Sequence, residues 1–316
     1  MKSLRNTNMQ GSTLACIIIG ATAMTPVLAQ KAGTEERLAS PFSAELSVGA
    51  EYDSNVSVAE LDTNTGGDDF AAVIDVDLGF EKDLSENTEI SAGYSFSQSL
   101  HDQFTNFDIQ THFASAGLSH DFGAVDAGAS YRFIYSSLGG TGFLQMQQIE
   151  PYVTKFFGKK MFVRAAYTYT DKDFKNRTDR DAMAHAGGAD IYWFVDGVRT
   201  YFVTGYKYES QDAVDPQFDY NAHKIKVRFS QRIPMGKRYA KLKLGWRYET
   251  RDYSSITPSI GVIRNDDRHR LGAEIEIPVT DKIYTLLEYE YSDYTSNLPS
   301  ADYTQSLAGL KLGVRF

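Results

Sequence analysis

The sequence has 316 residues, a formal net charge of −9 at pH 7 and a single cysteine. The excess of acidic residues argues against nucleic acid as a partner, because phosphate backbones are bound by clustered Lys and Arg. Tyr (20) and Phe (19) are abundant and Pro (8) is scarce, a composition that favours β-strands.

The first residues have the pattern of a secretory signal peptide. Lys2 and Arg5 give a positive start, residues 14–24 form an apolar core, and the small residue Ala29 precedes Gln30. The apolar core is too short to span a bilayer as an anchor. We expect cleavage after Ala29, which removes Cys16 and with it any disulfide or thiol chemistry. A short segment, residues 30–41, then precedes the main domain.

The rest of the chain contains no run of about 20 apolar residues, so no transmembrane helix is predicted. Instead, fourteen segments alternate apolar and polar residues, as β-strands with two different faces do. Alternation is weakest in the sixth and eighth segments. The predicted strands cover residues 43–53, 70–82, 88–99, 107–121, 124–136, 145–157, 161–171, 184–195, 199–210, 221–233, 239–251, 267–278, 283–294 and 303–316.

The links between these segments alternate in length. Tight turns follow the even segments, whereas longer polar links, such as 54–69, 172–182, 210–219 and 253–266, follow odd segments. A soluble sandwich has no reason to follow this rule, but outer-membrane barrels have short periplasmic turns, longer external loops and an even strand number. The sequence therefore predicts an all-β fold: a transmembrane antiparallel β-barrel of about 14 strands over residues 42–316.

Aromatic residues give independent support for a barrel in a membrane. Tyr or Phe lies near the outer ends of odd strands and near the inner ends of even strands. Two such girdles mark the two interfaces of a bilayer. Examples at the outer ends are Tyr52, Tyr94, Tyr131, Tyr167, Tyr206, Tyr248 and Tyr289, and those at the inner ends are Phe80, Phe122, Trp193, Phe229 and Phe316.

The chain ends in the middle of a strand pattern. Leu310, Leu312, Val314 and Phe316 are apolar at alternate positions. Pairing of this last strand with the first closes a barrel and leaves no exposed edge. A terminal aromatic residue after alternate apolar residues also resembles the signal read by the outer-membrane barrel assembly machinery. We therefore expect that machinery and outer-membrane lipid as partners.

The inward-facing positions are unusually charged and predict a basic wall beside acidic flanks. The basic wall comprises Lys224, Lys226, Arg228, Arg232, Lys241, Lys243, Arg247, Arg251, Arg268 and Arg270. The acidic wall comprises Glu45, Glu51, Asp53, Asp75, Asp77, Glu81, Glu274, Glu276, Glu288 and Glu290. Such segregation creates a transverse field. Three roles of this charge pattern are considered. The charges select polar solutes in a pore, they pair with one another across the lumen as structural contacts, or they dock a plug or a substrate polypeptide.

No catalytic or metal-binding pattern is found, so we expect neither enzymatic activity nor a cofactor. The histidines, His101, His112, His120, His185, His223 and His269, fall on different predicted strands and at different predicted heights. His112 and Ser115 have opposite parity and face opposite sides of the wall. No His/Cys cluster has zinc spacing. Residues 61–69 lack the spacing of a calcium loop and are interpreted as a solvated external loop.

Residues 49–56 (GAEYDSNV), the fourteen strand patterns and the final Arg315 and Phe316 carry a resemblance to a known family. Over residues 42–316 the chain resembles the barrel domain of surface lipoprotein assembly modifiers and, more widely, outer-membrane β-barrel porins. The resemblance implies a barrel that helps lipoproteins reach the cell surface. Family members carry a helical-repeat domain before the barrel, whereas here only residues 30–41 separate the predicted cleavage site from the first strand.

Two functions are expected as alternatives, both in the bacterial outer membrane. One is a porin-like channel or conduit whose charged lumen passes small polar solutes. The other is a barrel that translocates or assembles a surface lipoprotein or polysaccharide together with a periplasmic partner. The missing recruitment domain favours the channel, and the resemblance favours the second alternative.

Overall fold

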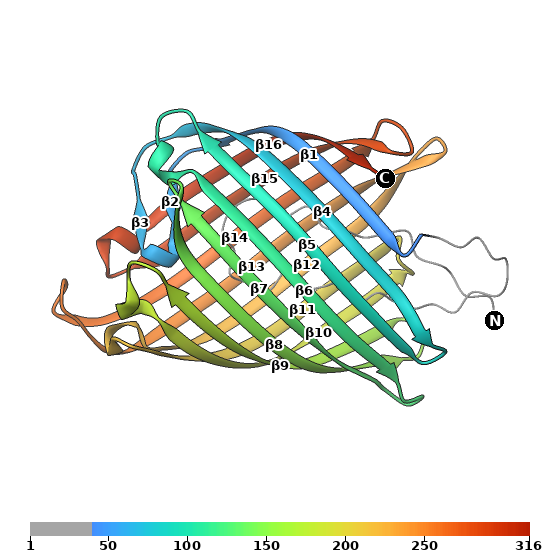
Figure 1. The fold of residues 1–316 in the computed structure, drawn as a ribbon, viewed down its shortest axis with the longest axis horizontal. Coiled ribbons are helices and arrows are strands. Elements are labelled where there is room, and N and C mark those ends of the chain that lie inside the picture. Colours follow the sequence, from blue (N-terminus) through green and yellow to red (C-terminus); the bar gives the residue numbers. More distant parts are fainter. Residues whose placement is uncertain (1–39) are drawn as a thin grey trace.

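The computed structural model describes residues 40–316, and the predicted signal peptide lies outside the described residues. Fourteen antiparallel strands form a closed barrel (Figure 1). The barrel strands are β1 (Phe42–Asp53), β4 (Asp69–Ser85), β5 (Thr88–His101), β6 (Ile109–Asp121), β7 (Asp126–Leu138), β8 (Thr141–Phe157), β9 (Met161–Phe174), β10 (Ala182–Asp196), β11 (Thr200–Ala213), β12 (Tyr220–Met235), β13 (Arg238–Thr257), β14 (Val262–Pro278), β15 (Ile283–Ser296) and β16 (Tyr303–Arg315). The predicted fold class is confirmed.

Closure occurs between the first and last strands, as predicted. β1 pairs with β16 on one side and with β4 on the other, so every barrel strand has two hydrogen-bonded neighbours. Closure satisfies the backbone N–H and C=O groups that an open sheet would leave at its edges. All fourteen strands lie where the alternation predicts them, with ends that differ by a few residues.

Two links differ from the predicted alternation of short and long connections. Only Gly139 and Gly140 join β7 to β8, and both have positive φ (55° and 76°), which permits a tight hairpin. The long link predicted over 253–266 is mostly strand, because β13 and β14 continue outwards and leave residues 258–261 as the loop. The β-branched pair Ile256 and Ile263 extends this ladder beyond a bulge.

The two ends of the barrel have different connections. The six links 86–87, 122–125, 158–160, 197–199, 236–237 and 279–282 lie at the end that also carries Phe42 and Arg315, termed here the turn end. The opposite end, termed the loop end, carries five single-turn 3-10 helices: η1 (Ala59–Leu61), η2 (Thr105–Phe107), η3 (Thr178–Arg180), η4 (Pro216–Phe218) and η5 (Pro299–Ala301). None of the helices within residues 40–316 is long and apolar enough to cross a membrane.

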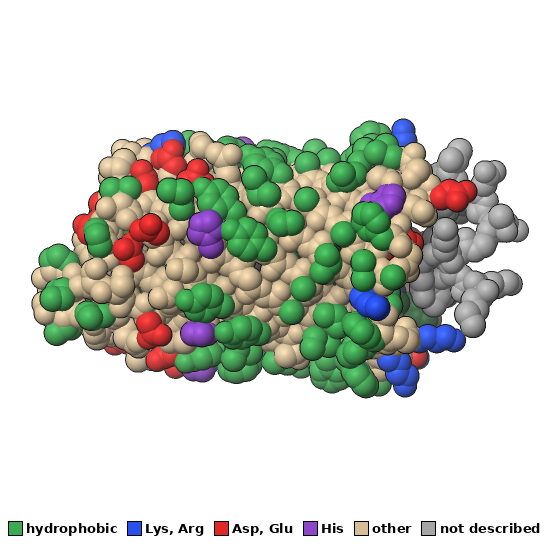
Figure 2. Space-filling view, turned by 90° about the horizontal axis from the view of Figure 1, so that it is seen from below, with side chains coloured by type: hydrophobic (Ala, Val, Ile, Leu, Met, Phe, Trp, Pro, Cys, Tyr) green, Lys and Arg blue, Asp and Glu red, His purple; other side chains and the backbone are tan. Residues whose placement is uncertain are grey.

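Side chains alternate strictly between the outside and the inside of the barrel. On β1, Leu46 and Val48 are 39% and 48% exposed, whereas Glu45 and Ser47 are 6% and 4% exposed. Hydrophobic side chains therefore cover the outer face, the reverse of a soluble protein. The interior is mostly polar but also holds buried apolar clusters, one of them formed by Phe162, Tyr192, Phe194, Tyr201 and Val203. Figure 2 shows hydrophobic side chains along the outer face, with acidic side chains gathered towards the loop end.

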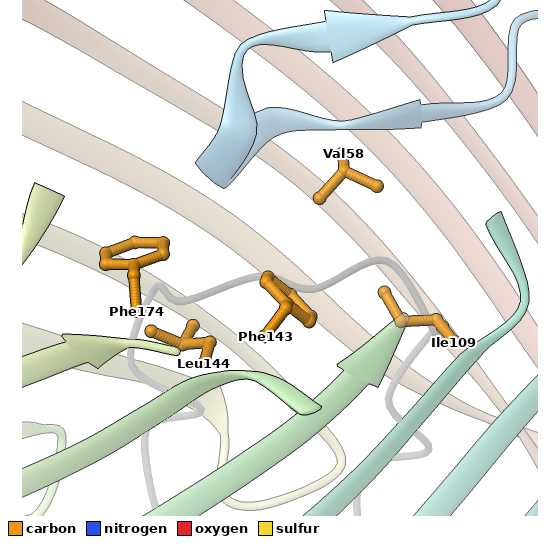
Figure 3. Close-up of a cluster of buried hydrophobic side chains, with 5 residues drawn as sticks. All are labelled: Val58, Ile109, Phe143, Leu144 and Phe174. Carbon is orange, nitrogen blue, oxygen red and sulfur yellow. The ribbon is translucent and has the colours of Figure 1, made fainter. Parts of the chain in front are cut away.

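The longest loop folds into the barrel. Residues 54–68, termed the inner loop, contain η1 and the small hairpin of β2 (Ser57–Val58) and β3 (Thr63–Asn64). Val58 packs against a cluster on the opposite wall, formed by Ile109, Phe143, Leu144 and Phe174 (Figure 3). The interpretation of residues 61–69 as a solvated external loop is therefore wrong for most of this segment. The inner loop carries Val56 and Val58, and burying these side chains favours an inward fold.

Candidate functional site

An ion cluster fixes the inner loop to the barrel wall. The Asp62 carboxylate accepts hydrogen bonds from Arg264 on β14, at 2.7 and 2.9 Å, and from Arg180 in η3, at 2.8 Å. The side chains of Arg264 and Asp62 are only 2% and 6% exposed. Burial alone would raise the pKa of Asp62, but the hydrogen bonds and charge of Arg264, with Arg180, hold it well below its usual range. Ionised groups therefore hold the inner loop against the barrel wall. We term the contacts of Asp62 with Arg264 and Arg180 the Asp62 clasp.

A second set of contacts ties the inner loop to the wall near β16. Asn55 Nδ2 donates to the carbonyl oxygen of Thr304 at 3.2 Å, and Asn64 Nδ2 donates to the carbonyl oxygen of Ser300 at 2.9 Å. Elsewhere in the loop, Asp62 bonds Arg264 of β14, and Val58 packs against the wall of β6–β9. The contacts of the inner loop therefore span the lumen. The inner loop is thus attached to the barrel wall at several points.

One cavity, of about 70 Å³, lies between the inner loop and the wall of β8–β14. Glu60 and Asp62 contribute carboxylates from the loop, and the wall contributes mainly cations. These cations are Lys172, Lys207, Lys224, Arg251 and Arg268, and Glu209 lies among them. Burial raises the pKa of Glu60, although Arg251, Arg268 and Lys172 oppose that shift. A solute in this cavity meets carboxylates on the loop and cations on the wall.

A second cavity, of about 40 Å³, lies on the other side of the inner loop. Glu51 and Asp53 of β1 line it, together with Glu60 and His101. Because Glu60 lines both cavities, the loop separates a cation-rich compartment from a carboxylate-rich one. The charge pattern inside the barrel is therefore organised by the loop as well as by the strands.

The ten residues of the predicted basic wall lie on inward positions of β12, β13 and β14 and are interleaved with carboxylates. Most are ion-paired: Lys224 with Glu209 (2.9 Å), Lys226 with Asp190 (2.8 Å), Lys241 with Glu276 (3.0 Å), Lys243 with Glu274 (2.7 Å), Arg251 with Glu249, Arg268 with Asp266 (2.9 Å) and Arg270 with Glu290 (3.2 Å). Arg232 also has an interaction partner. Arg228 and Arg247 form no ion pair within 4.0 Å with any residue of the described range 40–316.

Two cations of β16 pair with four residues of the predicted acidic wall. Lys311, which is 1% exposed, bonds Asp75 (2.9 Å) and Glu288 (3.1 Å), and Arg315 bonds Glu45 (2.9 Å) and Glu276 (2.6 Å). Asp77 accepts a hydrogen bond from Ser95, and Glu81 is exposed near the turn end. Glu274 and Glu290 pair with the basic wall, as given above. Sequence reasoning missed Lys311 and Arg315, although both share the inward parity of the last strand.

Other lumen residues were also missed by the sequence analysis. Arg132 and Arg164 hold Glu150 at 2.9 and 2.6 Å, all three at inward positions of β7–β9. Lys207 and Glu209 follow the same parity on β11. Strand alternation carried enough information to find these residues. For Glu60 and Asp62 the available signal was the apolar pair Val56 and Val58 in an otherwise polar loop.

The residues of the predicted assembly signal lie outside the barrel, along the closing seam. Leu310 and Leu312 are each 54% exposed and Phe316 is 73% exposed, while Val314 pairs with Leu46 of β1. The Phe316 N–H donates to the Ala44 carbonyl oxygen at 2.9 Å. Their recognition by an assembly machinery remains a prediction.

Four of the six histidines share one position on the outer face, which corrects the expectation that they lie at different heights. Each lies opposite an aromatic residue of the preceding strand: His112 opposite Phe96, His185 opposite Tyr169, His223 opposite Tyr208 and His269 opposite Tyr248. Tyr94, Tyr167 and Tyr206 hydrogen-bond the first three rings at 2.8, 2.5 and 2.8 Å. We term these contacts Tyr–His rungs.

The rungs continue around the barrel. Gln147 and Ser306 occupy the histidine position in two of the three remaining hairpins and bond Tyr131 and Tyr289 at 2.9 and 3.3 Å. In the third, between β1 and β4, Tyr52 donates to Asp68 at 3.4 Å. From one hairpin to the next, the rung moves by two residues relative to the residues that are paired across the strands: His112 pairs with Tyr135 and Tyr135 with Gln145, whereas the next rung is at Gln147. Because the strands are tilted, this shift keeps the rungs at the same height along the barrel axis. Figure 2 shows histidines among hydrophobic side chains beside the acidic loop end. The sequence analysis predicted the tyrosines of this belt as the outer aromatic girdle but missed their histidine partners, because those contacts depend on the register between strands.

The described residues contain no group of three or more His, Cys, Asp or Glu side chains arranged to hold a metal ion. The charged groups of the lumen instead pair with one another across neighbouring strands.

No protein-family model and no curated protein sequence matches this chain. Solved structures are similar in fold. An anion-selective porin from Comamonas acidovorans is 10% identical, with 87% of this chain and 98% of that chain aligned and a TM-score of 0.50. A loop L8 deletion mutant of OmpT, an outer membrane protein of Vibrio cholerae, is 11% identical, with 87% and 98% aligned and a TM-score of 0.49.

At such low identity the likeness shows the fold alone. The chain has the closed antiparallel β-barrel fold of outer-membrane proteins. The narrower resemblance to surface lipoprotein assembly modifiers has no family match behind it.

Proposed function

We propose that the protein is an outer-membrane channel for small polar solutes, exported by a signal peptide that is cleaved after Ala29. Its apolar outer face and charged interior suit a barrel that crosses lipid around a wet lumen. The short links identify the turn end as the periplasmic end, since outer-membrane barrels carry their tight turns there. Solute passage requires neither an enzymatic step nor a cofactor.

The belt of Tyr–His rungs supports this placement in a membrane. The register places equivalent rungs in hairpins around the barrel, and on the face drawn in Figure 2 histidines lie among hydrophobic side chains beside the acidic loop end. Aromatic rings with a polar edge are stable at the boundary between hydrocarbon and headgroups. A partner protein would cover one side of the barrel, whereas a belt around the barrel fits contact with lipid on all sides.

The observation that carries the channel proposal is the fixed inner loop with a charged cavity on each side. Glu60 on the loop faces a wall that carries Lys172, Arg251 and Arg268. Opposed charges across a narrow, low-dielectric passage produce a field that orients and selects polar solutes. In this proposal the inner loop is the constriction, and the basic wall sets ion preference.

The alternative is translocation or assembly of a surface lipoprotein or polysaccharide with a periplasmic partner. A polymer would need the inner loop to leave the lumen. That movement breaks the buried hydrogen bonds of Asp62 with Arg264 and Arg180, although Arg264 keeps Asp266 as a partner at 2.8 Å. The clasp therefore favours small solutes over a polymer.

Conductance in planar bilayers tests the channel proposal. Refolded protein, with an intact barrel verified on detergent gels, is added to one side of a bilayer under a salt gradient. We expect steady single-channel steps and a reversal potential away from zero. Silent bilayers with folded protein would contradict the proposal, and loss of surface lipoprotein or polysaccharide in a deletion strain would then support the alternative.

A further inference from the structure

The basic wall contains a hollow where two neighbouring inward positions lack side chains. Arg228 pairs with Gly245, and Gly245 pairs with Gly272, so the three residues form one rung across β12, β13 and β14. A Cβ atom placed on either glycine would have no neighbouring atom closer than 4.0 Å. Most other inward glycines of the barrel, such as Gly49 and Gly313, are instead crowded by nearby atoms.

Cations occupy the two neighbouring rungs on β12 and β13, and Glu290 of β15 lies directly opposite Gly272. The next rung towards the loop end is Lys226, Arg247 and Arg270, and the next towards the turn end includes Lys243. Lys226, Lys243 and Arg270 are held by Asp190, Glu274 and Glu290 at 2.8, 2.7 and 3.2 Å. Three of the cations that line the hollow are therefore paired with carboxylates, whereas Arg228 and Arg247 are not.

Arg228 and Arg247 are the two cations without an ion pair in this part of the described chain. They are diagonal neighbours at the edge of the hollow, because Arg247 lies two residues beyond Gly245 on β13. Arg247 is exposed to the lumen and Arg228 is half-buried. Like charges on directly opposed strand positions destabilise a sheet, and Arg247 lies between Lys226 and Arg270. A bound anion would offset this repulsion.

We infer that the hollow between Arg228 and Arg247 binds the oxyanion of a solute, a carboxylate or a phosphate, during passage through the lumen. This inference rests on the proposed channel function and names the solute class. A guanidinium group presents its N–H donors as a planar fork that matches two oxygens of a carboxylate or phosphate. The glycine positions provide room for the group to which the oxyanion belongs.

Calorimetric titration with inorganic phosphate tests the site without requiring conduction. The protein is the full barrel refolded in a neutral detergent at low salt. We expect saturable binding with one site per barrel, weakened at least about tenfold in the double variant R228Q/R247Q. The control K159Q/K160Q removes the same charge from two exposed lysines of the link 158–160 at the turn end, and we expect less than about a threefold change.

Further outcomes separate the site from general charge and from the channel proposal. R247K keeps the charge and loses the fork, so we expect intermediate binding. Absence of saturable phosphate binding, or equal losses in the two double variants, would overturn the site. Silent bilayers together with normal phosphate binding would refute the channel and keep the site. Conducting bilayers in which R228Q/R247Q and the wild type have equal anion preference would refute a role of the site in passage.

Discussion

At the scale of single residues, Glu60 and Asp62 show how position decides the role of a carboxylate. Asp62 is bonded to Arg264 and Arg180 and stays ionised, so it holds the inner loop. Glu60 has an Oε2 atom that is buried without a hydrogen-bond partner, and burial raises its pKa. The inner loop thus carries one structural carboxylate and one that is poised to change its charge.

A pH-dependent ion preference follows for Glu60. Because its pKa is raised, Glu60 takes up a proton at higher pH than an ordinary glutamate as the solution is acidified. The passage then loses a negative charge beside Lys172, Arg251 and Arg268, so anion preference in bilayers should increase between pH 7 and pH 5. Glu60→Gln should have the acidic-pH preference already at pH 7. A Glu60→Gln channel with the full wild-type pH dependence would assign the effect to other groups.

At the scale of elements, the inner loop is the part of the barrel that we propose as the constriction. The loop begins where β1 and β4 stop pairing, at Asp53 and Asp69, and its contacts reach β8, β14 and η5. The apolar cluster around Val58 contributes about 1.5–3 kcal/mol for each fully buried large side chain. Hydrophobic packing and the Asp62 clasp together hold the constriction.

Asp62→Asn tests this role of the inner loop. The substitution removes the carboxylate that Arg264 and Arg180 bond, while Arg264 keeps Asp266 at 2.8 Å, so loop docking should weaken by about 1.5–3 kcal/mol. We expect larger single-channel conductance and more open-channel noise in planar bilayers. Asp68→Asn is the matched control, because Asp68 is an exposed residue of the same loop whose carboxylate bonds only Tyr52 among the described residues. Equal conductance of the two variants would argue against the clasp.

At the scale of the whole molecule, closure of the barrel links residues from both ends of the chain. Lys311 of β16 reaches past β1 to Asp75 of β4 and also bonds Glu288 of β15. Arg315 joins Glu45 of β1 to Glu276 of β14 in the same way. Two cations of the last strand therefore neutralise carboxylates on both sides of the seam.

Lys311→Met should destabilise the closed barrel. The substitution leaves the buried carboxylates of Asp75 and Glu288 without their cation, at a cost of about 3 kcal/mol. We expect a lower urea midpoint in lipid vesicles and conversion to the unfolded gel band at a lower temperature. Leu310→Met, an outward and volume-conserving change on the same strand, should have little effect. An unchanged midpoint for Lys311→Met would show that the seam does not depend on this ion cluster.

Local patterns in the sequence were enough to predict the strands and the sides that their residues face. Strand residues alternate because successive side chains point to opposite faces, so the alternation identified the inward parity of Lys226, Arg247 and Glu274 from neighbouring residues alone. The closing strand was predictable for the same reason. The missed inward residues, such as Lys311, were visible in the same alternation.

The tertiary structure decided which charges meet and where the longest loop lies. Asp62 and Arg264 are 202 residues apart in the chain, and no local pattern couples them. The pairing of Lys243 with Glu274, the isolation of Arg228 and Arg247 and the common height of the Tyr–His rungs depend on register and stagger between strands. Alternation along one strand repeats every two residues and determines a face. Contact between strands depends on how the closed barrel aligns them, which is a property of the whole chain.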